Sequence, residues 1–128
     1  MPTLMRTSPR FTAEHSGDAI IIRLHPHALD SRFSRRDRRS LEALLATHSR
    51  LILDLNAVAT INGTGLEIIA DWTNYADSAG NSLVLAQCSR QVMSLMSILG
   101  ASQVARVAPS VSDAIHYLDA IRPKKNIA

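Results

Sequence analysis

The sequence predicts an α/β fold, with a mixed, mostly parallel sheet of about four or five strands and about four helices. Short apolar runs typical of buried strands alternate with segments whose apolar residues recur at helical spacing. After an opening hairpin, this alternation implies right-handed crossovers between parallel strands. The chain has 128 residues, 46% of them hydrophobic, which is the size of one domain with its own core.

The first part of the chain predicts a tail and a hairpin. We expect residues 1–10 to be a flexible tail. Phe11 to Glu14 favours a short strand, turn-forming residues follow at 15–18, and the β-branched run Ala19 to Leu24 favours a second strand. Residues 25–30 contain a proline, which removes a backbone donor, and they are expected to form a loop.

The next segment combines a helix with a dense cluster of arginines. Ser34 can cap the helix, Asp37 lies in its first turn, and apolar residues then recur at helical spacing. The arginine cluster consists of Arg32, Arg35, Arg36, Arg38 and Arg39. Two interpretations of the cluster stay open. It can be the solvated start of a helix, or it can pair with an acidic partner, a use favoured because cations in a first turn oppose the helix dipole and repel one another. Arg35 and Arg39 are our candidates for that contact.

The segment from residue 50 to residue 79 is expected to organise the sheet. Arg50 to Leu55 suits a central strand that is buried on both faces. A Gly/Thr turn at residues 61–66 opens a second helix from about Gly65 to Ala79. Its inward face is expected to comprise Leu66, Ile69, Ala70, Thr73 and Ala76, with Trp72 half-buried and with Glu67, Asp71 and Asn74 exposed.

The remaining elements repeat the alternation. Ser82 to Ala86 has the composition of another buried strand, and Ser89 begins a third helix whose Met-rich stripe is expected to fill the core. A short strand at about Val104 to Val107 and a helix from Ser110 complete the fold. The domain is therefore expected to span residues 11–121, with a short tail at 122–128.

Two interpretations of the turn at residues 61–66 stay open. The spacing of Thr64 and Glu67 is that of a capping box, in which each side chain satisfies a free backbone N–H. The glycines, the hydroxyl and the positive end of a helix also suit a phosphate, bound or covalently attached.

Composition and motifs argue against several classes of function. Aromatic residues make up 4% of the chain, so specific nucleic-acid recognition is not expected despite the net charge of +3. His25, His27 and Asp30 lack a zinc-ligand spacing with cysteine, and Cys88 is expected to be a small buried residue. Catalytic and nucleotide-binding motifs are missing, so we expect no cofactor and no enzymatic activity. No apolar run suits a membrane span, and we expect a cytoplasmic protein.

Several of these segments together resemble the STAS domain shared by sulfate transporters and anti-sigma-factor antagonists. The resemblance runs from about Phe11 to Leu118. Its most specific parts are the apolar strand with Asp54, the I-x-x-T-G-L turn at residues 61–66, the pair Leu99-Gly100, and the Ser-x-x-Ala sequence around Asp113 and Ala114.

The resemblance implies a non-enzymatic module that binds an anti-sigma factor or serine-threonine kinase. In free-standing members the turn usually reads Asp-Ser-Ser/Thr-Gly-Leu, the partner kinase phosphorylates a hydroxyl there, and the unphosphorylated form binds the partner. Here Asn62 replaces the aspartate and Gly63 replaces the first hydroxyl residue, which leaves Thr64 as the candidate acceptor. The partner surface is expected to comprise Asn62, Gly63, Thr64, Gly65, Leu66, Glu67, Asp71 and Asn74, with Arg35 and Arg39.

The resemblance also implies an alternative role. Small STAS subunits accompany lipid-transport ABC complexes, where they dock on the ATPase subunit. A basic single-domain chain fits that role as well.

Overall fold

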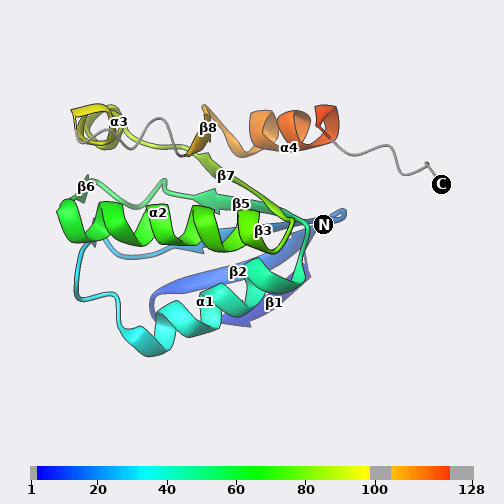
Figure 1. Cartoon of the computed structure of the whole chain (residues 1–128), viewed down its shortest axis with the longest axis horizontal. Coiled ribbons are helices and arrows are strands. Elements are labelled where there is room, and N and C mark those ends of the chain that lie inside the picture. The colour runs from blue at the N-terminus through cyan, green and yellow to red at the C-terminus, as the bar shows by residue number, and fades with distance from the viewer. Residues whose placement is uncertain (1–2, 99–104, 122–128) are drawn as a thin grey trace.

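The computed structural model describes residues 3–98 and 105–121 and has the predicted α/β architecture (Figure 1). Within these residues, the main sheet has six strands in the order β1-β2-β3-β5-β7-β8. Their bounds are Thr3–Thr7, Phe11–Ser16, Ala19–Leu24, Arg50–Asp54, Ser82–Ala86 and Arg106–Ala108. A two-stranded ladder joins β4 (Ala28–Leu29) to β6 (Thr60–Ile61). The helices are α1 (Arg35–Thr47), α2 (Gly63–Ser78), α3 (Arg90–Ile98) and α4 (Val111–Ala120).

The strand directions confirm a mixed, mostly parallel sheet. Strands β1, β2 and β3 pair antiparallel, whereas β3, β5, β7 and β8 pair parallel. The sheet is larger than the four or five strands expected, because Thr3–Thr7 forms an edge strand within the stretch predicted to be a flexible tail. The short ladder also places strand β4 inside the predicted loop at residues 25–30. The predicted tail at residues 122–128 and the pair Leu99-Gly100 lie outside the described residues.

Two apolar layers sandwich the central strand β5. Leu51 and Leu53 belong to the core cluster that α1 and α2 cover, whereas Ile52 belongs to a second cluster that α4 covers. Every residue of β5 is buried, as the apolar run at its centre, Leu51 to Leu53, predicts. Figure 1 shows α4 apart from α1 and α2, across the sheet.

Two side chains differ from their predicted environments. Trp72 is fully buried rather than half-buried, and its ring meets Phe33 edge-on at a centroid distance of 5.4 Å. The loop before α1 supplies Phe33, and helical periodicity alone does not reveal such a contact. The Met-rich stripe of α3 is divided, because Met96 is buried whereas Met93 is 40% exposed.

A buried carboxylate ties together the carboxyl ends of three parallel strands. Asp54, at the end of β5, is 3% exposed. Its oxygens accept hydrogen bonds from Arg23 Nε of β3 at 3.2 Å and from Gln87 Nε2 beyond β7 at 3.1 Å. They also accept the Asn56 backbone N–H at 2.9 Å. Gln87 has a φ of 61°, a left-handed conformation that a non-glycine residue adopts only when its surroundings stabilise it.

Replacing Asp54 by asparagine is expected to destabilise the fold. Asp54→Asn removes the charge that pairs with Arg23 and turns one acceptor into a donor that faces Gln87 and Arg23. We expect the free energy of unfolding to fall by about 2 kcal/mol, the cost of breaking buried charge-assisted hydrogen bonds. Urea denaturation, followed by the fluorescence of Trp72, measures this free energy of unfolding. Asp77→Asn is the control, because Asp77 is exposed and its ion pair with Arg106 is long, at 4.0 Å. An equal loss of unfolding free energy in the two variants would contradict the prediction.

Candidate functional site

The first turn of α2 is capped by a different residue from the one predicted. Asn62 is the N-cap, and its Oδ1 accepts a hydrogen bond from the Gly65 backbone N–H at 2.8 Å. The helix therefore begins at Gly63 rather than at Gly65, and the predicted capping box of Thr64 and Glu67 is wrong. Asparagine caps a helix at least as well as threonine, so the earlier residue takes this role.

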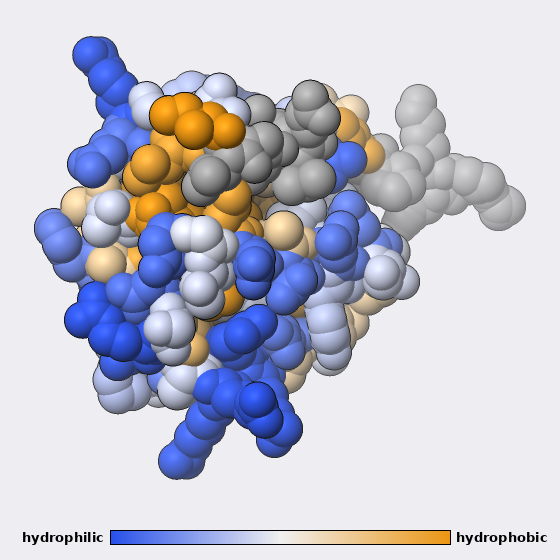
Figure 2. Space-filling view, turned by 60° about the vertical axis from the view of Figure 1, so that its left-hand side comes forward, coloured by the Kyte–Doolittle hydropathy of each residue, from blue (hydrophilic) through white to orange (hydrophobic). Residues whose placement is uncertain are grey.

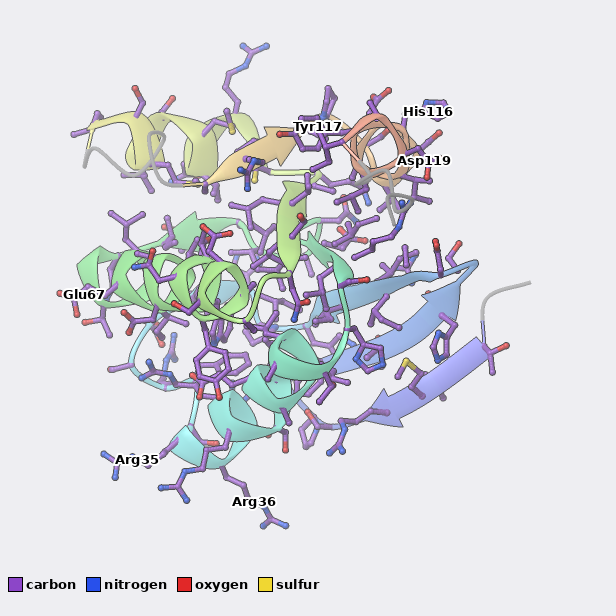
Figure 3. The ribbon with its side chains drawn as sticks, turned by 45° about the vertical axis from the view of Figure 1, so that its right-hand side comes forward. Arg35, Arg36, Glu67, His116, Tyr117 and Asp119 are labelled. Carbon is purple, nitrogen blue, oxygen red and sulfur yellow. The ribbon has the colours of Figure 1, made fainter. Side chains whose placement is uncertain are left out.

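With the cap at Asn62, the Thr64 hydroxyl is not needed for helix formation. Thr64 lies within the first helical turn and is exposed, as are Asn62, Gly63 and Glu67, while Leu66 is half-buried. Figure 3 shows Glu67 pointing away from the body of the protein. The turn thus presents a free hydroxyl, two polar side chains and part of a leucine to solvent.

Gly65 has a packing role within the same turn. A Cβ atom at this position would lie 2.0 Å from the Leu29 carbonyl oxygen and 2.8 Å from Ile61 Cγ1, so only glycine lets α2 approach the β4–β6 ladder. Gly65 is buried, so the prediction that it belongs to the partner surface is wrong. Gly63 differs, because a Cβ there would meet nothing within 4 Å.

Asp71 and Asn74 continue the exposed face of α2 beyond its first turn. The Asp71 carboxylate also accepts a hydrogen bond from Arg38 Nη2 at 3.4 Å, which links this face to α1. Next to this pair, a groove of about 630 Å³ runs between the two helices, and its lining includes Asp71, Asn74 and Tyr75. Tyr75 is 46% exposed, and sequence analysis did not single it out.

The arginine cluster divides into paired and outward-facing members. Arg32 binds Asp30 at 2.8 Å, which raises the pKa of Arg32 and lowers the pKa of Asp30 through their hydrogen bonds. Arg38 binds Asp71. Among the described residues, the other three arginines of the cluster form no ion pair, and Figure 3 shows two of them, Arg35 and Arg36, pointing into solvent.

An apolar surface adjoins the turn and was missed by sequence reasoning. Met93 and Ile98 of α3 are 40% and 77% exposed, and α3 packs against β6, the strand that leads into the turn. Figure 2 shows hydrophobic surface gathered on this side of the molecule. The sequence of α3 has more apolar residues than one buried face needs, which could have indicated an exposed apolar surface, but the prediction placed them all in the core.

The structure offers little support for a metal or thiol site. Within residues 3–98 and 105–121, no group of three or more His, Cys, Asp or Glu side chains is arranged to hold a metal ion. Cys88 is half-buried, and burial together with the nearby Asp54 carboxylate raises the pKa of its thiol to about 11. In the same part of the chain, no helix is both long and apolar enough to cross a bilayer.

The chain belongs to the STAS domain family, whose model matches residues 10–114. Solved structures share the fold at low sequence identity. An anti-sigma factor antagonist from Mycobacterium paratuberculosis has a TM-score of 0.75 and 15% identity, over 89% of this chain and 99% of that chain. Unphosphorylated SpoIIAA, an anti-sigma factor antagonist, has a TM-score of 0.63 and 14% identity, over 96% of this chain and 100% of that chain.

The same fold occurs within a larger protein. The murine anion transporter Slc26a9 matches with a TM-score of 0.64 and 17% identity, and the match covers 93% of this chain but 22% of the transporter. No curated protein sequence matches the chain.

Gly65 and Gly63 provide a matched pair of substitutions that separates packing from exposure. Gly65→Ala is expected to lower the free energy of unfolding by about 2 kcal/mol or more, because the new methyl group overlaps the Leu29 carbonyl oxygen. Gly63→Ala is expected to be neutral or slightly stabilising, because its site is open and alanine favours a helix. Thermal or urea unfolding measures both. A Gly65→Ala variant as stable as Gly63→Ala would contradict the assigned packing.

Proposed function

We propose that the chain is a non-enzymatic anti-sigma-factor antagonist that binds an anti-sigma factor or a kinase-type regulator through the turn and helix at residues 62–74. The observation that carries this proposal is the exposed hydroxyl of Thr64 on a helix end that Asn62 already caps. Membership of the STAS family and the shared fold of anti-sigma factor antagonists support it.

The surroundings of the turn suit the docking of a protein. Leu66 and the exposed apolar residues of α3 offer hydrophobic contact, while Asn62, Glu67 and Asp71 offer polar contact around it. Protein interfaces commonly combine an apolar centre with a polar rim. The outward-facing Arg35 and Arg39 extend the surface with positive charge, which favours an acidic region on the partner.

We further propose that phosphorylation of Thr64 controls the docking. The kinase would transfer the γ-phosphoryl group of ATP to Thr64 Oγ, with loss of the hydroxyl proton and release of ADP. Bacillus SpoIIAA, which shares the fold, has been solved in phosphorylated and unphosphorylated forms. Because Asn62 supplies the cap, and a phosphate at a helix N-terminus is favourable, the modification would leave α2 intact. It would act on the partner by adding negative charge beside Glu67.

The phosphorylation site can be tested once the partner kinase has been co-purified. Incubation with this kinase and ATP is expected to place one phosphate on Thr64, detected by phosphopeptide mapping. Thr64→Ala should abolish the modification, whereas the control Ser78→Ala, at the far end of α2, should keep it. Gly63→Ser places a hydroxyl residue at an open position where the family usually has one, and it is expected to add a second phosphate acceptor. Stoichiometric kinase binding without modification of Thr64 would refute the switch but leave the docking proposal standing.

The arginines make a separate prediction about the partner's charge. Arg35→Glu combined with Arg39→Glu is expected to weaken partner binding at least about tenfold at low ionic strength, and by less as salt is added, because exposed charges are screened. Arg106→Glu on β8 is a control for a single charge reversal away from the turn. An affinity of the double variant equal to that of the unchanged protein across the salt series would remove these arginines from the interface.

Identification of the partner decides between the two functions implied by the family. Affinity purification from the source cells, followed by mass spectrometry, should recover a kinase-type or anti-sigma regulator in stoichiometric amount. Recovery should be lost in the charge-reversed variant Glu67→Arg. Stoichiometric recovery of an ABC transporter ATPase through the same surface would overturn the antagonist proposal in favour of a docking subunit of a lipid transporter.

A further inference from the structure

A second feature of the surface is a basic groove of about 660 Å³ between the β1–β2 turn and the start of α1. Arg6 and Arg10 line it from the β1–β2 side, and Ser34, Arg36 and Asp37 line it from α1. None of these residues belongs to α2 or α3. The groove is therefore separate from the turn and helix at residues 62–74, although α1 also carries Arg35 and Arg39 of the proposed docking surface.

The charge of the groove is strongly one-sided. Three arginines, Arg6, Arg10 and Arg36, are among the residues that line it, against one acidic residue, Asp37. Asp37 is already engaged with the N-cap, since its carboxylate accepts a hydrogen bond from Ser34 Oγ at 2.9 Å. Among the described residues, none of the three arginines has a carboxylate within ion-pair distance. Like charges gathered around one groove repel one another, and an anion placed between them would relieve that repulsion.

The β1–β2 wall of the groove is held in a defined shape. Ser8 Oγ accepts hydrogen bonds from the backbone N–H groups of Arg10 at 3.1 Å and Phe11 at 3.2 Å, and the Ser8 N–H donates to the Phe11 carbonyl at 2.8 Å. The register of β1 against β2 shifts between Leu4 and Arg6, just before the arginine that lines the groove.

The opposite wall adds a donor that carries a partial positive charge. The first backbone hydrogen bond of α1 runs from the Arg38 N–H to the Ser34 carbonyl at 2.9 Å. The N–H group of Arg36, a lining residue, precedes this bond and has no carbonyl partner within the helix. It lies at the positive end of a 13-residue helix, which favours negative charge nearby and strengthens the attraction of the arginines for an anion.

We propose that the basic groove binds a small, soluble molecule through its phosphate groups. Arginine guanidinium groups bind phosphate oxygens with paired, charge-assisted hydrogen bonds, and three arginines among the lining residues suit a ligand with more than one phosphate. The volume lies in the range of small-molecule sites. No aromatic side chain is among the lining residues, so the phosphates rather than a stacked base would be recognised. The concave shape favours a soluble ligand over the flat surface of a membrane.

Isothermal titration calorimetry with inorganic triphosphate, at low ionic strength, tests the proposal on the full chain. We expect one site per chain, weaker binding of inorganic monophosphate, and an affinity that falls as salt is added. Arg6→Gln and Arg36→Gln should each weaken binding roughly tenfold, which corresponds to the loss of one charge-assisted hydrogen bond. Both side chains are exposed, so their thermal unfolding midpoints should stay unchanged.

Arg90→Gln is the matched control, because it removes one exposed positive charge from α3 and should leave triphosphate binding unchanged. An equal loss in all three variants would overturn the proposal, since it would show only a general attraction to a basic protein. Sedimentation with vesicles that contain anionic phospholipid tests whether lipid headgroups, rather than a soluble molecule, supply the phosphate. Vesicle binding that Arg36→Gln abolishes, without measurable triphosphate binding, would also overturn it and would assign the arginines to a membrane surface.

Discussion

The buried Asp54 carboxylate is the interaction on which the functional edge of this domain depends. A charge that is removed from water destabilises a protein unless it is paired and fully hydrogen-bonded. Here the donors come from three places, namely Arg23 on β3, the Gln87 side chain beyond β7, and the backbone of Asn56. Satisfying Asp54 therefore aligns the carboxyl ends of neighbouring parallel strands. The same edge begins the connection through β6 to α2, which carries the proposed docking turn.

Within that turn, structural and functional roles fall on different residues. Gly65 faces inward and permits close packing, Asn62 closes the helix end, and Thr64 is left exposed. A hydroxyl without a structural duty can gain a phosphate without a loss of folding energy. A switch on such a residue would act through the charge and shape that a partner meets, rather than through unfolding of the helix.

The arginine cluster is used in more than one way. Arg32 and Arg38 form ion pairs with carboxylates of the same chain. Their charges are therefore already paired within the domain. Arg35 and Arg39 remain outward-facing, while Arg36 joins Arg6 and Arg10 around the basic groove. This division separates a surface suited to an acidic protein from a concave site suited to phosphate. A domain built in this way could combine protein docking with the binding of a small anion.

The sequence by itself determined the fold class, the central strand and the starts of α1, α3 and α4, because these depend on local periodicity and local caps. Ser34 acts as the expected N-cap, and Ser110, where the last helix was expected to start, caps α4, since a cap contacts backbone groups only three residues away. Helix α2 shows the limit of this reasoning, because Asn62 and Thr64 can both cap and the local pattern does not rank them.

Only the tertiary structure decided the features that join distant segments. The edge strand β1 exists because it pairs with β2, although its own sequence predicts a tail. Trp72 is buried because Phe33 reaches it from another part of the chain, and Gly65 is required because the Leu29 carbonyl lies against it. The basic groove likewise depends on two arginines from the β1–β2 side meeting one from α1. Such contacts follow from how the elements pack, and local sequence patterns carry no record of that packing.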